Sequence, residues 1–202
     1  MTPYMRSLIL PFLICLLAAT GCRKTVSSTV DSVLQDPVKG KTIDYLIAAG
    51  QHYANQNGYQ PVNLSTLSFT VKFDSSAVYR SVEASNQEDI NKLYGFADNN
   101  ANHEQYSARI GWNWARNALR LYAYVYNAGV RSSQEIGAVS IGSEHSCSIK
   151  VVGNQYQFTV DKLSITMPRS SQTTQAEGYR LFPYFGGDET APHDIHIVIH
   201  ES

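Results

Sequence analysis

The sequence of 202 residues lacks a surplus of either charge. It carries 16 basic and 17 acidic side chains, which gives a formal net charge of −1. Proteins that bind nucleic acids need an excess of Lys and Arg to neutralise phosphates, so we expect no nucleic-acid partner. Charged residues make up only 16% of the chain, which argues against a long disordered tail.

The apolar run near the N-terminus is too short to span a membrane. It covers the 12 residues 8–19, whereas a spanning helix needs about 20. Arg6 precedes the run and small residues follow it, which is typical of a signal peptide. We therefore predict a signal peptide over residues 1–21.

The end of this signal, Ala19-Thr20-Gly21-Cys22, resembles the lipobox of bacterial lipoproteins. The resemblance implies lipidation of Cys22, and two or more acyl chains would anchor the protein firmly. An ordinary secretory signal with a chance cysteine is the alternative. We expect a lipid-anchored envelope protein, with the outer membrane favoured and its periplasmic or surface face left open. Residues 22–35 are rich in Ser and Thr and predict a flexible tether, and residues 36–202 then form the folded domain.

Cysteine is scarce in the predicted mature chain. Cys15 leaves with the signal and Cys22 would be lipidated, which leaves Cys147. A lone thiol forms no internal disulfide, so we expect a fold that does not depend on oxidation.

One helix is predicted at the start of the domain. Asp36 can cap it with Pro37 at its first position, and Asn57-Gly58 can end it. Six residues between these ends follow helical spacing: Ile43, Leu46, Ile47, Gly50, Tyr53 and Ala54.

Beyond residue 66 the apolar pattern changes to a period of two, which predicts half-buried strands. Many short strands separated by Gly and Asn turn signals are typical of a sandwich or barrel. We predict strands over residues 67–73, 77–82, 90–97, 107–114, 119–126, 135–141, 146–152, 156–161, 163–167, 179–185 and 194–200.

Two hairpins can be given a register, because only one alignment puts apolar residues opposite apolar residues. In the first, Trp114 pairs with Leu119 and the core face continues through Trp112–Leu121, Ile110–Ala123 and Ala108–Val125. The second turns at Gly153-Asn154 and pairs Val151–Tyr156, Ile149–Phe158 and Cys147–Val160, so Cys147 is expected to be buried and unreactive.

The polar face of the first hairpin is the best candidate ligand site. Flat tyrosine rings match the apolar faces of sugars, and amide or guanidinium groups match their hydroxyls. Tyrosine is also a good strand former, so this face is alternatively structural. The predicted glycan-binding residues are Arg109, Asn113, Arg120, Tyr122, Tyr124 and Tyr126.

A second candidate is the loop that begins at Gly186-Gly187, a pair that lets the backbone turn or approach closely. Asp188 and Asp194 offer oxygens suited to Ca²⁺, although the spacing does not match an EF-hand. A simple turn between strands is the alternative. With His103 from the Asn-rich segment 98–104 and His193, these residues are predicted to form the rim of a ligand site. His196 and His200 share a strand face about 13 Å apart, too far for one metal, and are expected on the solvent side.

The run of residues 107–161 resembles the successive strands of the concanavalin A-like lectin and glucanase sandwiches, ending with Gln155-Tyr156-Gln157-Phe158-Thr159-Val160-Asp161 and Met167. The resemblance implies an all-β, antiparallel jelly-roll sandwich, to which we add the N-terminal helix. It covers about half of the mature chain and supports fold more than function. The Glu-x-Asp-x-x-Glu strand of the glucanases and the Arg-x-Glu-x-Arg strand of the alginate lyases are absent.

Three functions follow as hypotheses. The first is a non-catalytic module that binds a polysaccharide, with the lipid anchor as its contact with the membrane. The second is a polysaccharide lyase or glycoside hydrolase with a dispersed site that uses His103, Arg109, Tyr124 and Asp188. The third is a structural or adhesion protein that binds another protein.

Overall fold

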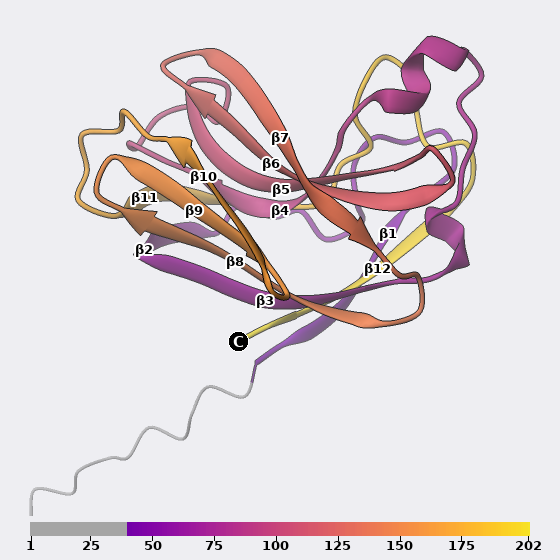
Figure 1. The fold of residues 1–202 in the computed structure, drawn as a ribbon, viewed down its shortest axis with the longest axis horizontal. Helices are drawn as coiled ribbons and strands as arrows, with labels where there is room; N and C mark the ends of the chain where they lie inside the picture. The colour runs from indigo at the N-terminus through magenta and orange to yellow at the C-terminus, as the bar shows by residue number, and fades with distance from the viewer. Residues whose placement is uncertain (1–39) are drawn as a thin grey trace, which may run out of the picture. The chain divides into compact units, whose positions relative to one another are not determined.

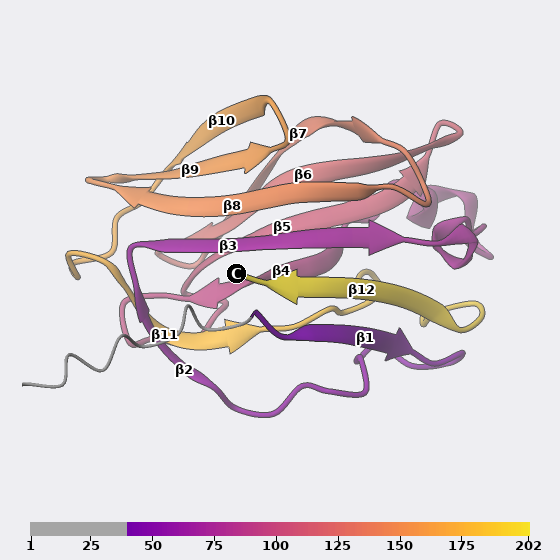
Figure 2. The same cartoon turned by 90° about the horizontal axis from the view of Figure 1, so that it is seen from below.

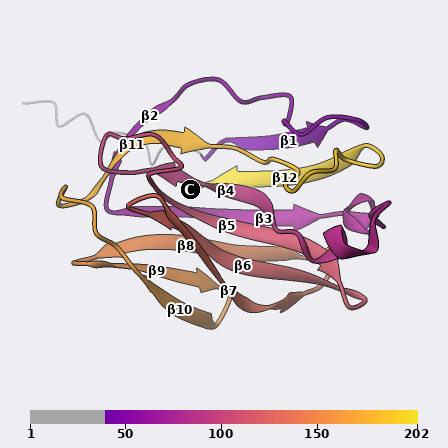
Figure 3. The same cartoon turned by 90° about the horizontal axis from the view of Figure 1, so that it is seen from above.

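The computed structural model describes residues 40–202, which form an antiparallel β-sandwich (Figure 1). Sheet A has the strand order β1-β12-β3-β8-β9-β10, and sheet B has the order β2-β11-β4-β5-β6-β7. Figure 2 shows sheet A from its outer side, and Figure 3 shows the molecule from the side of sheet B. All pairs of neighbouring strands are antiparallel, as the sequence predicts for a jelly roll. The predicted signal, tether and lipidation site lie outside the described residues.

The elements follow one another with short connections. Their bounds are β1 Thr42–Ile47, β2 Pro61–Leu64, β3 Thr66–Phe73, η1 Ser75–Ala77, η2 Ala84–Glu88, β4 Asn91–Ala97, β5 Tyr106–Ala115, β6 Ala118–Asn127, β7 Val130–Val139, β8 Glu144–Val152, β9 Gln155–Val160, β10 Leu163–Pro168, β11 Ala176–Leu181 and β12 Ile195–Glu201. Among them, no helix is long and apolar enough to cross a membrane.

The core lies between the two sheets and is built by alternation along each strand. In β3 the four residues Leu67, Phe69, Val71 and Phe73 are at most 2% exposed, while the residues between them face outward. Trp112 from sheet B is fully buried and its ring lies 5.3 Å from that of Phe73. The period-two pattern therefore predicts the core face correctly.

Both predicted hairpin registers are confirmed. Every pair expected between β5 and β6, and between β8 and β9, occurs in the structure. The first hairpin closes more tightly than expected, because Ala115 also pairs with Ala118 and leaves only Arg116 and Asn117 in the turn. Both turn residues have positive φ, as a two-residue hairpin turn requires.

Cys147 is 3% exposed at the predicted buried position, and burial raises the pKa of its thiol. The thiol is thus a small apolar core group. On β12 the expected alternation is also found, with His196 and His200 more exposed than Ile197 and Ile199.

The predicted N-terminal helix is wrong where the structure describes it. Residues 42–47 form β1 instead, which pairs with β12 and buries Tyr45 and Ile47. Ile43, Tyr45 and Ile47 also satisfy a period of two, and six residues are too few to separate that period from a helical one. Gly50 then turns the chain with a φ of +76° instead of continuing a helix.

The strand predicted over residues 77–82 is also wrong. The short helix η1 begins there, and the Asp74 carboxylate accepts a hydrogen bond from the backbone N–H of Ser76 to cap it. Val78 and Val82 are exposed, so their apolar pattern marks no core face. The sequence also gave no signal for β2, a strand of only four residues.

Candidate functional site

The outer face of sheet B, on the side away from sheet A, carries the predicted tyrosine and arginine residues of the β5–β6 hairpin. On this face Arg109 pairs with Tyr124, Gly111 with Tyr122 and Asn113 with Arg120. The structure divides the face into a covered end, close to the β5–β6 turn, and an open end.

The covered end is shielded by the segment that contains η2. Asn113 is 0% exposed, and its amide donates a hydrogen bond to the Glu88 carbonyl at 3.2 Å. The Tyr122 hydroxyl donates to Asn113 Oδ1 at 3.1 Å. Buried polar groups need such partners, and here the protein itself supplies them. The prediction that Asn113 contacts a glycan is therefore wrong, and Tyr122 is largely withdrawn from the surface.

Arg120 also has a structural role at this end. Its guanidinium forms an ion pair with Glu135 at 2.6 Å and donates to the Ala115 carbonyl at 3.2 Å. These contacts occupy its donors toward β7 and the hairpin turn, so Arg120 does not offer them to a ligand.

The open end contains Arg109, Tyr124 and Tyr126. Arg109 is 7% exposed, and its guanidinium carbon lies 5.4 Å from the centre of the Tyr124 ring. Its stem crosses the backbone at Gly95, where a Cβ atom would stand only 2.7 Å from Arg109 Cγ. Glycine at this position is what allows the arginine to lie flat on the sheet. Within residues 40–202 Arg109 has no carboxylate partner, and its buried Nε has no hydrogen-bond acceptor.

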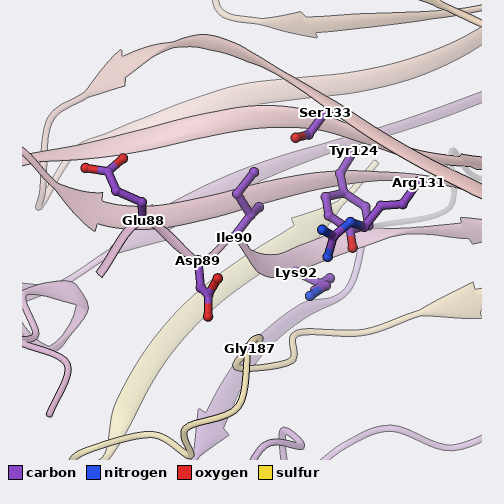
Figure 4. Close-up of a pocket in the computed structure, with 8 residues that line it drawn as sticks. All are labelled: Glu88, Asp89, Ile90, Lys92, Tyr124, Arg131, Ser133 and Gly187. Atoms are coloured by element: carbon purple, nitrogen blue, oxygen red, sulfur yellow. The ribbon is translucent and has the colours of Figure 1, made fainter. Parts of the chain in front are cut away.

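Two further cations, Lys92 of β4 and Arg131 of β7, join this end of the face. Figure 4 shows both converging with the Tyr124 ring at a cavity of about 160 Å³. The cavity is lined by Glu88, Asp89, Ile90, Lys92, Tyr124, Arg131, Ser133 and Gly187.

Sequence reasoning missed Lys92 because of a β-bulge. Strict alternation would put Lys92 on the same face as Tyr94 and Phe96, which point into the core. The register shifts between Lys92 and Tyr94, so Lys92 pairs with Gly111 and emerges on the outer face. A bulge leaves no dependable mark in a single sequence, whereas Arg131 lay in a segment that the predicted strand 135–141 did not reach.

Burial and charge act together on Lys92. Burial, followed by repulsion from Arg109 and Arg131, lowers the pKa of its ammonium group to about 8, while Asp89 has a weaker opposite effect. The ammonium nitrogen lies 5.1 Å from the ring centre of Tyr124 and 5.8 Å from that of Tyr184. Aromatic faces attract cations, which offsets part of the cost of desolvation.

An aromatic rim extends the site beyond the cavity. The His52 ring stacks on Tyr184 at 5.2 Å with an interplanar angle of 11°, and Tyr53 meets Tyr184 edge-on at 5.0 Å. Tyr53 is 63% exposed. These rings offer a flat, amphipathic surface next to Lys92.

The predicted rim loop reaches the cavity through Gly187. Glu189 holds this loop in place by accepting hydrogen bonds from the backbone N–H groups of Val82 and Glu83, each at 2.8 Å. These bonds lower the pKa of the Glu189 carboxyl group. The loop is thereby fixed over the beginning of β4, with Asp188 exposed beside it.

The other rim residues have different surroundings. The Asp194 carboxylate accepts a hydrogen bond from the Ala49 backbone at 2.8 Å, and His193 Nε2 bonds the Ser76 carbonyl at 2.9 Å. These are structural bonds between turns, as the alternative interpretation expected. Within residues 40–202 no group of three or more His, Cys, Asp or Glu side chains is placed to hold a metal ion, so the calcium hypothesis finds no ligand set there.

His103 lies near the open end, against β11. Its Nδ1 atom and the Tyr179 hydroxyl are 2.9 Å apart, and the two rings meet edge-on. Burial and then the positive charge of Arg109 lower the pKa of His103. The structure thus brings His103, Arg109, Tyr124 and Tyr126 into one region, and their role as a glycan site stays a prediction.

Comparison with known proteins shows relatives of the fold. No family model and no curated protein matches the sequence. A glycoside hydrolase family 16 endo-glucanase from Bacteroides ovatus, solved with a glucan-derived ligand, superposes with a TM-score of 0.53 and 12% identity over 81% of this chain and 84% of its own. A Bacteroides ovatus mixed-linkage glucan GH16 protein, solved with a G4G4G3G product, gives 0.51 and 12% over the same shares.

An alginate lyase from Klebsiella pneumoniae superposes with a TM-score of 0.50 and 14% identity over 66% of this chain. This chain spans 56% of the length of that lyase. At such identities the likeness concerns the fold alone. The chain therefore has the concanavalin A-like jelly-roll β-sandwich fold, which these carbohydrate-active proteins share.

Proposed function

We propose that the protein binds a polysaccharide on the outer face of sheet B, at the open end between Lys92, Arg109 and Tyr124. One observation carries the proposal: aromatic rings and cations without protein partners surround a cavity in this face. A sugar offers apolar C–H faces to such rings and oxygen acceptors to such donors. The fold supports the proposal, because the structural relatives named above act on glycans.

We favour binding over hydrolysis because of the carboxylates. A glycoside hydrolase needs two carboxyl groups that face each other across the scissile bond. The two acids that line the cavity, Glu88 and Asp89, are neighbours in sequence and point in different directions (Figure 4). They do not form a facing pair.

A lyase is the second candidate, and Lys92 is the observation that favours it. With a pKa of about 8, this amine is partly neutral near physiological pH and can accept a proton. Incubation with a polyuronate followed by measurement of ultraviolet absorbance tests this candidate, because elimination creates an unsaturated uronate. Growth of that absorbance, and its loss in Lys92→Gln, would establish the lyase.

A glycan array with the purified full chain tests the binding function. We expect binding to one polysaccharide class, weakened at least about tenfold by Tyr124→Ala and by Tyr184→Ala. Val152→Ala is the matched control, because Val152 is exposed on β8 of the other sheet. Binding that is indifferent to both tyrosine changes would refute this face as the site.

We also propose that a lipid on Cys22 anchors the protein in the bacterial envelope, with the outer membrane as the favoured location. The signal and lipobox pattern of residues 6–22 supports this. Labelling cells with a palmitate analogue is the test. Label on the wild type and none on Cys22→Ser is expected, whereas an unlabelled wild type would indicate an ordinary secreted protein.

A further inference from the structure

Three cations at the open end lack the carboxylate partners that other buried cations of this protein have. Three arginines are buried in residues 40–202, and two of them, Arg169 and Arg180, form ion pairs with Asp98 and Glu201. Arg109 is the exception in this described region, and neither of its cationic neighbours forms an ion pair there either.

An unpaired buried cation is costly, because the protein interior solvates charge poorly. The tyrosine rings next to Lys92 and Arg109 compensate only in part. Like charges also repel here, since Arg109 and Arg131 both disfavour the charged form of Lys92. An anion placed among them would relieve both costs at once.

The acids nearby do not supply that anion. Asp89 lies beneath Gly187, where a Cβ atom would stand only 2.0 Å from Asp89 Oδ2. In Figure 4 its carboxylate points toward that loop and away from Arg131, and Glu88 points to the opposite side. Glu104 is exposed and forms no ion pair within the described chain.

We infer that the bound glycan is anionic, and that a carboxylate or sulfate group on a sugar ring sits between Lys92 and Arg131 against the Tyr124 ring. Arg109, which is nearly buried, adds positive potential from beside the ring. Guanidinium and ammonium groups bind carboxylates and sulfates through short, charge-assisted hydrogen bonds. This inference rests on the proposed glycan function and specifies the charge of its ligand.

The test compares three polymers on the purified full chain: polygalacturonate, a sulfated galactan and a neutral mixed-linkage β-glucan. We expect an anionic polymer to bind and its affinity to fall as salt is raised, because salt screens exposed charges. Lys92→Gln and Arg131→Gln should each weaken binding at least about tenfold. Lys150→Gln, which removes the same charge from the exposed face of β8 in sheet A, should leave affinity unchanged.

The outcomes separate this inference from the proposed function. Binding of only the uronate or only the sulfated polymer identifies the anion and supports the inference. Equal binding of the neutral glucan, still dependent on Tyr124, would overturn the anionic ligand and keep the glycan function. An equal loss in Lys150→Gln would show nonspecific attraction and also overturn it. Binding of none of the three, together with a blank glycan array, would overturn both.

Discussion

Two buried arginines of this protein have opposite surroundings. Arg169 is 4% exposed and donates two hydrogen bonds to Asp98, at 2.8 and 3.2 Å, and others to Ser171 and Thr173. Arg109 is 7% exposed and faces the ring of Tyr124 without a carboxylate. Both sites exclude water to a similar degree, yet only the first is electrically neutralised.

The difference separates a cluster that holds the fold from one that is suited to a ligand. Asp98 ties the segments around β4, β9 and residues 169–177 together, and Tyr156 donates a further hydrogen bond to it at 2.5 Å. Burial would raise the pKa of Asp98, but the bonds from Arg169 and Tyr156 hold it below its usual value. No comparable internal network engages Arg109, so its charge remains available to a bound anion.

The largest expected effect is on the neutralised cluster. Arg169→Met leaves the Asp98 carboxylate buried without its partner, so the free energy of unfolding should fall by about 3–5 kcal/mol. Urea unfolding followed by circular dichroism measures this. The double variant Arg169→Met with Asp98→Asn should recover part of the loss, and a loss below about 1 kcal/mol in the single variant would contradict a structural role.

The unpaired cluster should show an unusual pH dependence of stability. Folded Lys92 loses its proton above a pKa of about 8, whereas the unfolded chain keeps it up to about 10.5. Below pH 8 both states are protonated and the cost of the buried charge is constant. Between these values the unfolded state binds more protons, so stability should rise with pH by about 1–3 kcal/mol.

Urea unfolding of the wild type and of Lys92→Met across this pH range measures that contribution. The variant should lack the rise, because it has no titrating group at this position. Curves of the same slope for both proteins would show that Lys92 is not desolvated by its neighbours.

A smaller effect is expected at the covered end of the same face. Tyr122→Phe removes the hydroxyl that donates to Asn113 Oδ1, which leaves a buried acceptor without a partner. Stability should fall by about 1 kcal/mol. Glycan affinity should not change, and any large loss of affinity would place the covered end inside the binding site.

Much of the fold could be predicted because its strands are long and strictly alternating. The β5–β6 and β8–β9 registers follow from one rule, the pairing of apolar with apolar residues. The rule fails for β1, whose six residues fit two periods equally well, and for β2, which is too short to show any period.

The candidate site could be predicted only in part. The face of β5 and β6 was found, but which of its ends is open depends on η2 and on the Gly187 loop, which pack there from distant parts of the sequence. Lys92 reaches the site only through a bulge in β4. Such tertiary choices leave no periodic signal along the chain.

The most direct test of the contrast between the two arginines is to measure stability and binding together in Arg109→Met. Methionine keeps most of the side-chain volume against Gly95 and Tyr124 and removes the charge. We predict that binding of polygalacturonate falls at least about tenfold, while the free energy of unfolding stays the same or rises by about 1 kcal/mol. Unchanged affinity, together with a loss of stability as large as that expected for Arg169→Met, would show that Arg109 also serves the fold and would contradict the account.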